Sequence, residues 1–110
     1  MMKVFIFVFL IFGTKNVYSD VFVGQFVTKV YSGYSHKGIF FKVSTGDARN
    51  PSGCKAGLNQ TFAVDPEFSN VNHVLSVLLF AQATTKQVEV EFYSDKCYQN
   101  HRVIRKVAVY

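Results

Sequence analysis

The sequence lacks the residue sets that most catalytic and metal sites require. It has no tryptophan, two prolines, two cysteines and only seven acidic residues in 110. It contains no Cys-x-x-Cys pair and no His/Cys cluster at ligand spacing, which excludes thioredoxin-like and zinc sites of the usual kind. No two carboxylates are spaced for acid/base work, and no glycine-rich phosphate-binding loop is present. We therefore expect a protein that is not an enzyme and holds no metal and no cofactor.

Long apolar runs are also scarce. The longest, residues 4–12, has nine residues, whereas a membrane-spanning helix needs about 20. A lysine precedes this run, and Val17 and Ser19 occupy the −3 and −1 positions of a cleavage site. This pattern is typical of a secretory signal peptide. We expect a signal peptide of residues 1–19, no membrane span, and a single secreted or periplasmic domain of residues 20–110.

The excess of basic side chains is small. The chain carries 12 basic against 7 acidic residues, a net charge of +5. Removal of Lys3 and Lys15 with the signal peptide leaves 10 against 7, or +3. Such a mild balance, in an exported protein, argues against nucleic acid as a partner.

The two cysteines, Cys54 and Cys97, are expected to form one disulfide. In an exported chain, a single pair of cysteines is most simply explained in this way. Closing a loop of this length stabilises a fold by about 4 kcal/mol on the chain-entropy model. For one small domain, that is a large share of the free energy of unfolding.

One stretch, residues 65–86, has the period of a helix. Its apolar side chains recur at i, i+3, i+4, i+7 and i+8, which predicts one buried stripe. The stripe consists of Val71, Val74, Leu75, Leu78 and Leu79. Either Asp65 or the pair Ser69 and Asn70 can cap this helix, and we expect it to end near residues 83–85.

The rest of the domain alternates with period two, as strands do. The expected strands are residues 24–31, 38–44, 60–64, 87–93 and 102–110. A hairpin connection of residues 32–37, a long loop of residues 45–57 and a turn of residues 94–101 separate them. The order β-β-β-α-β-β predicts a mostly β fold, a five-stranded OB-like barrel with one helix between strands three and four. An open α+β sheet is the alternative.

A second row on the helix is more apolar than a solvent-facing row should be. His73, Val77, Phe80 and Thr84 recur at helical spacing, away from most of the buried stripe. One interpretation is a broad core face with one exposed phenylalanine. The other is that this row packs against another subunit, which predicts a homo-oligomer.

The hairpin between the first two strands is the expected ligand-binding surface. Tyrosine offers a flat apolar face and a hydrogen-bonding tip, which suits sugar recognition, although tyrosine also favours strands for other reasons. The candidate ligand-binding residues are Tyr31, Ser32, Tyr34 and Ser35. The long loop of residues 45–57 is a second candidate contact surface.

Two segments resemble a family of bacterial toxin subunits. FVGQFVTKVYSGYSHKGIFFKV, residues 22–43, is similar to the opening hairpin of the B subunits of subtilase cytotoxin and of its typhoid-toxin relative. FSNVNHVLSVLLFAQATTKQVEVEF, residues 68–92, resembles their helix, threonine-containing loop and Val-x-Val strand. The family's glycan-contacting serine corresponds to Val23 here, and the cysteines are placed differently. No residue of the family's sugar pocket is therefore carried over.

The resemblance implies an exported bacterial OB-fold subunit. Subunits of this kind form pentameric rings, bind sialylated glycans and carry a separate toxic A subunit. From this we expect a non-catalytic, glycan-binding homo-oligomer with the possibility of an A-subunit partner. The alternative is an exported monomeric domain that binds or inhibits a protein and has no sugar site.

Overall fold

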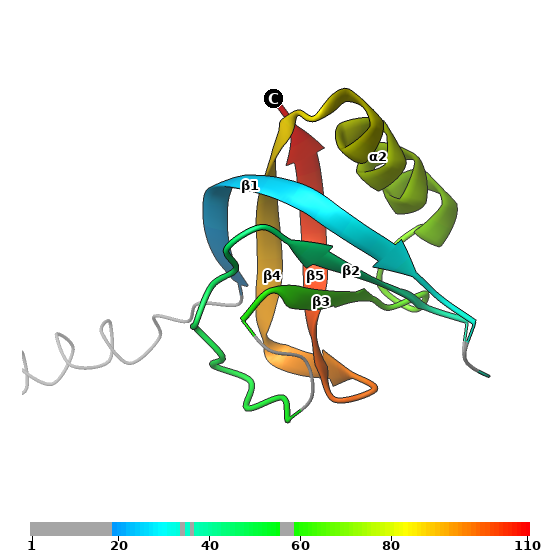
Figure 1. Ribbon diagram of the computed structural model, residues 1–110. Helices are drawn as coiled ribbons and strands as arrows, with labels where there is room; N and C mark the ends of the chain where they lie inside the picture. Colours follow the sequence, from blue (N-terminus) through cyan, green and yellow to red (C-terminus); the bar gives the residue numbers. More distant parts are fainter. Residues whose placement is uncertain (1–18, 34, 36, 56–58) are drawn as a thin grey trace, which may run out of the picture.

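The computed structural model describes residues 19–33, 35, 37–55 and 59–110 (Figure 1). Residues 1–18 of the expected signal peptide, Tyr34 and His36 lie outside the described residues, whereas Ser19, the last residue of that expected segment, begins β1. The elements are β1 (Ser19–Tyr31), β2 (Ile39–Val43), β3 (Thr61–Val64), α2 (Val71–Thr84), β4 (Gln87–Tyr98) and β5 (His101–Val109). This order is the predicted one.

The five strands close into a barrel in the order β1-β2-β3-β5-β4. All neighbouring pairs are antiparallel except β3 and β5, which pair in parallel where Ala63 meets Val103. Figure 1 shows β1 curving across the barrel so that it joins β2 on one side and β4 on the other. The OB-like barrel is therefore confirmed and the open sheet is not found. Closure removes the exposed edges that five short strands would otherwise present.

The first strand is longer than predicted because a glycine bends it without ending it. β1 begins at Ser19 rather than at residue 24. The pairing with β4 shifts between Phe22 and Gln25, and Gly24 between them has φ of 77°. This left-handed conformation suits glycine and allows a bulge that turns the strand from β4 toward β2.

The fourth strand also runs further than predicted. β4 continues to Tyr98, so the prediction of a turn over residues 94–101 is wrong. The turn consists only of Gln99 and Asn100, whose φ angles are 49° and 65°. Two central residues with positive φ are typical of a tight hairpin that matches the twist of its strands. Cys97 therefore lies on the strand, opposite Arg102 of β5.

The barrel interior is filled by aromatic and branched side chains from every strand. Phe41, Phe62, Phe92, Val43, Val64, Val88, Val90 and Ile104 are all fully buried. The inward face of β4 consists of Val88, Val90 and Phe92, which have no exposed surface. A core of this size is the main source of stability in a small domain.

The helix packs against β1 and β5 and covers one end of the barrel. Asn70 is its N-cap, because its side chain accepts a hydrogen bond from the His73 N–H at 3.1 Å. Leu78 and Ala81 are its buried residues. Leu79 was predicted in the buried stripe, but 46% of it is exposed, so that prediction is wrong. A step of 100° from Leu78 carries it to the flank of the helix.

Across the described residues, no helix combines the length and apolar character needed to cross a membrane.

Candidate binding surfaces

The long loop between β2 and β3 is held at its start by a buried glutamine. Only 7% of Gln25 is exposed, and its Oε1 accepts hydrogen bonds from the backbone N–H groups of Thr45 (2.9 Å) and Gly46 (3.0 Å). The Thr45 hydroxyl donates to the same oxygen at 2.9 Å. A buried amide oxygen needs such donors, and the loop supplies them. The position of Gln25, directly after the β1 bulge, and the start of the loop therefore stabilise each other.

A buried arginine of β5 holds both ends of the same loop. Arg102 is 4% exposed, and its guanidinium donates to the carbonyls of Asp47, Arg49 (2.6 Å) and Asn59 (2.7 Å). Its Cζ lies 4.3 Å from the ring centroid of Phe62. Burial lowers the pKa of the Arg102 guanidinium. Because one buried arginine donates to three carbonyls of the loop, the loop is anchored to the barrel.

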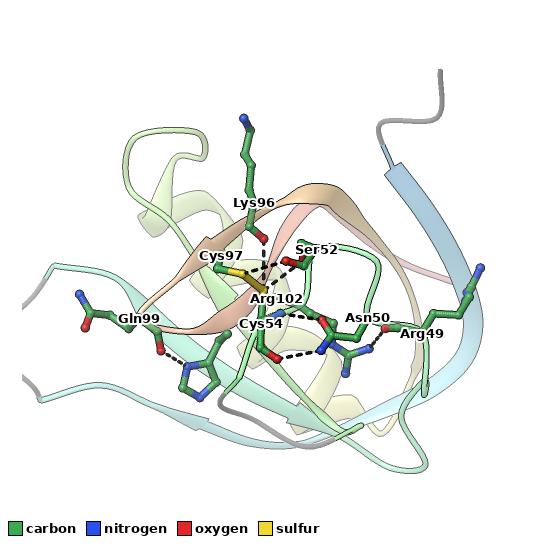
Figure 2. Close-up of a disulfide and its surroundings, with 9 residues drawn as sticks. Arg49, Asn50, Ser52, Cys54, Lys96, Cys97, Gln99 and Arg102 are labelled. Atoms are coloured by element: carbon green, nitrogen blue, oxygen red, sulfur yellow. Dashed lines mark hydrogen bonds between the residues drawn. A yellow bond between two sulfur atoms is a disulfide. The ribbon is translucent and has the colours of Figure 1, made fainter. Parts of the chain in front are cut away.

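The predicted disulfide between Cys54 and Cys97 is confirmed (Figure 2). Their Cα atoms are 5.6 Å apart. The side chain of Asn50 accepts from the Cys54 N–H at 3.1 Å and donates to its carbonyl at 2.7 Å. The bridge ties the loop to strand β4, and not to the following turn as predicted. A disulfide of this kind is typical of oxidising compartments outside the cytosol.

An ion pair shapes the exposed part of this loop. Arg49 Nε lies 3.0 Å from both carboxylate oxygens of Asp47, and Arg49 Nη2 donates to the Val21 carbonyl at 2.9 Å. The Arg49 side chain lowers the pKa of the Asp47 carboxyl, mainly by this hydrogen bonding. The loop is therefore preorganised, and it presents Asn50 to solvent.

The structure brings the predicted hairpin residues together only in part. Ser32 and Ser35 are exposed, while Tyr31 is half-buried. The Tyr31 ring stacks on Phe40 with centroids 5.4 Å apart, and the Lys29 ammonium lies 5.0 Å from its centroid. Much of the Tyr31 ring is thus in contact with the protein. Ligand binding by this hairpin remains a prediction.

Phe40 anchors a small aromatic cluster on the outer side of β2. Besides Tyr31, it contacts Tyr98 and His101, with ring centroids 6.3 Å and 4.6 Å away. The Tyr98 hydroxyl accepts from the Gly38 N–H at 3.0 Å. A Cβ on residue 38 would lie 2.4 Å from the Tyr98 ring, so the close approach requires glycine. This cluster fixes the entry into β2.

The predicted row on α2 faces outward. His73 and Thr84 are exposed, Val77 is half-buried and 53% of Phe80 is exposed. The row has no charged neighbour on its own helix, because α2 contains no Asp, Glu, Lys or Arg. His73 and Val77 also line a hollow of about 360 Å³ between α2 and β5. The apolar surface of α2 is therefore open to solvent in the single chain.

A second hollow, of about 310 Å³, adjoins the first at Arg105. We call it the Lys96 cleft and define it by its lining residues Tyr93, Asp95, Lys96 and Arg105, together with Phe68 beside it. The rings of Phe68 and Tyr93 are 5.9 Å apart, and the Lys96 ammonium lies 4.5 Å and 5.2 Å from their centroids. Cation–π contacts of this kind hold the ammonium in place.

Acidic residues of β4 neutralise two of the cations near these hollows. Arg105 pairs with Glu91 at 2.9 Å, and Lys106 pairs with Glu89 at 3.1 Å. Both glutamates lie on the outer wall of the barrel and are partly covered by their partners. The Lys96 cleft therefore differs from the rest of this wall, because its lysine lies outside this ladder of ion pairs.

In the part of the chain that the structure describes, no group of three or more His, Cys, Asp or Glu side chains is placed to hold a metal ion. His73 lies on α2, and His101 lies at the start of β5. These two histidines do not form a pair.

Sequence reasoning missed the residues that organise these surfaces. Gln25 and Arg102 sit in strand patterns where a polar residue normally faces water, and neither gave any signal of burial. Phe68 and Lys96 are 28 positions apart in the sequence, so no local pattern joins them. Only Asn59 and Asp47, short polar residues in a loop, carried a weak local signal for turn structure.

Comparisons of the chain with protein-family models, with characterised proteins and with solved structures give no match.

Proposed function

We propose that this protein is an exported, non-catalytic binding subunit that assembles with copies of itself and recognises a glycan. The single observation that carries the proposal is the outward face of α2, which has no Asp, Glu, Lys or Arg and exposes two large apolar side chains. A helix whose outer face meets water normally carries charged side chains there. In α2 that face instead exposes 46% of Leu79 and 53% of Phe80.

Burial of this face in an oligomer would remove its apolar surface from water. Exposed apolar patches on small proteins commonly mark interaction sites. Two such residues, Leu79 and Phe80, are adjacent, and Val77 extends the patch toward the hollow beside β5. The proposed interface is the row His73, Val77, Phe80 and Thr84, and a ring of about five copies is the assembly that the toxin B-subunit resemblance suggests.

The disulfide and the preorganised loop support the rest of the proposal. The Cys54–Cys97 bridge agrees with secretion or periplasmic export. A loop fixed by Gln25, Arg102 and the bridge can present side chains with little loss of entropy on binding. A separate A subunit is a further proposed partner, which the resemblance alone suggests.

The first test is the native mass of the exported, oxidised protein by sedimentation at micromolar concentration. We expect an oligomer, and we expect Phe80→Glu to dissociate it because the new charge would be buried without a partner. Val23→Glu is the matched control, since Val23 is as exposed as Phe80 (54% against 53%) and lies on β1 rather than on α2. A wild-type protein that is monomeric throughout the concentration range would contradict the assembly.

A glycan array tests the ligand. Reproducible sugar binding by the assembled protein would support the proposal, and its loss in Tyr31→Ala would place the sugar at the hairpin. The alternative function is a monomeric domain that binds or inhibits a protein. The hollow of about 360 Å³ between α2 and β5 favours this alternative function, because grooves of this kind bind segments of partner proteins. A monomer with no sugar binding would favour this alternative.

A further inference from the structure

The Lys96 cleft combines features that suit a sugar, and it lies away from the hairpin predicted from the sequence. It offers aromatic surface, because 46% of Phe68 is exposed and the Tyr93 ring lines the hollow. It offers hydrogen-bonding groups of both kinds, since Lys96 and Arg105 donate and Asp95 accepts. Its volume of about 310 Å³ is at the lower end of the range for small-ligand sites.

Two charged side chains of the cleft have unused hydrogen-bonding capacity. Among the residues that the structure describes, no carboxylate forms an ion pair with Lys96 and no cation forms one with Asp95. By contrast, Arg105 and Glu91 on the same wall are paired with each other. A ligand in the cleft would therefore meet one free donor group and one free acceptor group.

The backbone that carries Lys96 is fixed. Lys96 precedes Cys97, whose disulfide ties β4 to the long loop. Figure 2 shows the Lys96 side chain pointing away from this disulfide and from the loop. Its ammonium rests against the rings of Phe68 and Tyr93. A donor that is already held in place loses less entropy when a ligand binds.

We propose that the Lys96 cleft binds a neutral hexopyranose of a glycan. The apolar face of the sugar ring would lie on the exposed surface of Phe68. Two neighbouring hydroxyls would donate to Asp95 and accept from Lys96. An uncharged sugar fits better than an acidic one, because the opposite charges of Asp95 and Lys96 leave no net attraction for a carboxylate on the ligand. This inference rests on the proposed glycan-binding function and names its site and sugar class.

The charge balance distinguishes the proposal from a general anion site. With Arg105 paired to Glu91, the free charges of the cleft are one lysine and one aspartate, which cancel. Such a site has no net attraction for an anion, but it can bind several hydroxyl groups at once. A hydroxyl both donates and accepts, so it can satisfy either side chain.

The test uses the exported, oxidised protein labelled with ¹⁵N and titrated with methyl β-galactopyranoside and methyl α-glucopyranoside at millimolar concentrations. We expect at least one of these sugars to shift the amide signals of Phe68, Tyr93, Asp95 and Lys96. Asp95→Asn and Lys96→Gln should each weaken binding about tenfold, the effect of losing one hydrogen bond to a charged group.

Matched controls separate a binding effect from a folding effect. Phe68→Ala should weaken binding, whereas Val21→Ala, a truncation at a similarly exposed apolar side chain on β1 outside the cleft, should not. Glu67→Gln is the control for Asp95→Asn, since Glu67 is also exposed. All variants should keep the dispersed spectrum of the folded protein.

Three outcomes would overturn the inference. The first is that both neutral sugars shift Tyr31, Ser32 and Ser35 instead, which would leave glycan binding intact at another place. The second is that N-acetylneuraminic acid shifts the cleft while neutral sugars do not, which would replace the sugar class. The third is that no sugar shifts any signal and the glycan array is also blank, which would remove the proposed function as well.

Discussion

The guanidinium of Arg102 lies 4.3 Å from the ring centroid of Phe62, beneath the long loop that joins β2 to β3. One face of the arginine thus meets the aromatic core, while its N–H groups meet loop carbonyls, including that of Asn59 at 2.7 Å. This single contact links the barrel interior to the loop.

Replacement of Arg102 by methionine should lower the free energy of unfolding by about 2–4 kcal/mol. Methionine fills similar space but leaves three carbonyls without their donor. Urea denaturation of the oxidised protein measures the change. Arg105→Met on the same strand is the control, because Arg105 is exposed, and its effect should stay within about 0.5 kcal/mol. Equal effects of the two substitutions would contradict the role assigned to Arg102.

The disulfide should contribute about 4 kcal/mol, because it closes a loop with a sequence separation of 43 residues. The variant in which Cys54 and Cys97 are both serine should therefore unfold at much lower urea concentration than the oxidised protein. Hydrogen exchange should increase most near Asn50, whose side chain bonds to Cys54. If the loop exchanged at the same rate in both proteins, Gln25 and Arg102 alone would suffice to hold it.

Gly38→Ala should destabilise the protein, because the added methyl would lie 2.4 Å from the Tyr98 ring and 2.6 Å from the Val64 carbonyl oxygen. We expect a loss of about 1–3 kcal/mol, the usual cost of overpacking a closed site. Thermal unfolding measures it. Ser35→Ala, at an exposed position of the same connection, is the control and should change little. Tyr98→Phe should cost only the hydrogen bond to Gly38, about 1 kcal/mol.

Protonation of Asp47 should weaken the fold in acid. Arg49 lowers the pKa of Asp47 in the folded state below its ordinary value of 3.8. The folded state therefore binds this proton less readily than the unfolded state does. The stabilisation is present above about pH 3.8 and is lost as the pH falls through the lowered pKa.

Denaturation curves measured at neutral pH and in acid, with wild type and Asp47→Asn, test this expectation. The difference in stability between the two proteins should be largest at neutral pH and should shrink in acid. Asp95→Asn serves as control, because Asp95 is exposed and makes no ion pair within the described part of the chain. A difference that did not depend on pH would show that the Asp47 charge contributes nothing through its proton.

Local patterns predicted the elements and their order well. They failed where the same residues can either end a strand or continue it. From the sequence we expected the first strand to begin at Gly24, yet in the barrel Gly24 forms a bulge within β1. Residues 94–101 are polar and read as a turn, yet most of them continue β4, because pairing with β5 satisfies their backbone. The helix stripe was right for Leu78 and wrong for Leu79. The spacing of apolar residues shows which side of the helix faces the core, but it does not show whether a residue at the edge of that side is buried.

The candidate site was less accessible to sequence reasoning than the fold. The hairpin was chosen because tyrosine and serine occur together there, a local signal. The Lys96 cleft forms only when the segment before α2 lies against the end of β4, which brings Phe68 to within 5.9 Å of Tyr93. No periodicity records such a contact, since the two residues belong to different elements.

By itself the sequence determined the five strands, the one helix, their order and the disulfide, because hydrophobic period, turn residues and cysteine number are local or countable properties. Tertiary structure alone decided which polar residues would be buried. Gln25 and Arg102 can lose water only because loop backbone groups arrive to replace it. It also decided which apolar residues, such as Phe80, would be left exposed, because one helix cannot turn every face toward a single barrel.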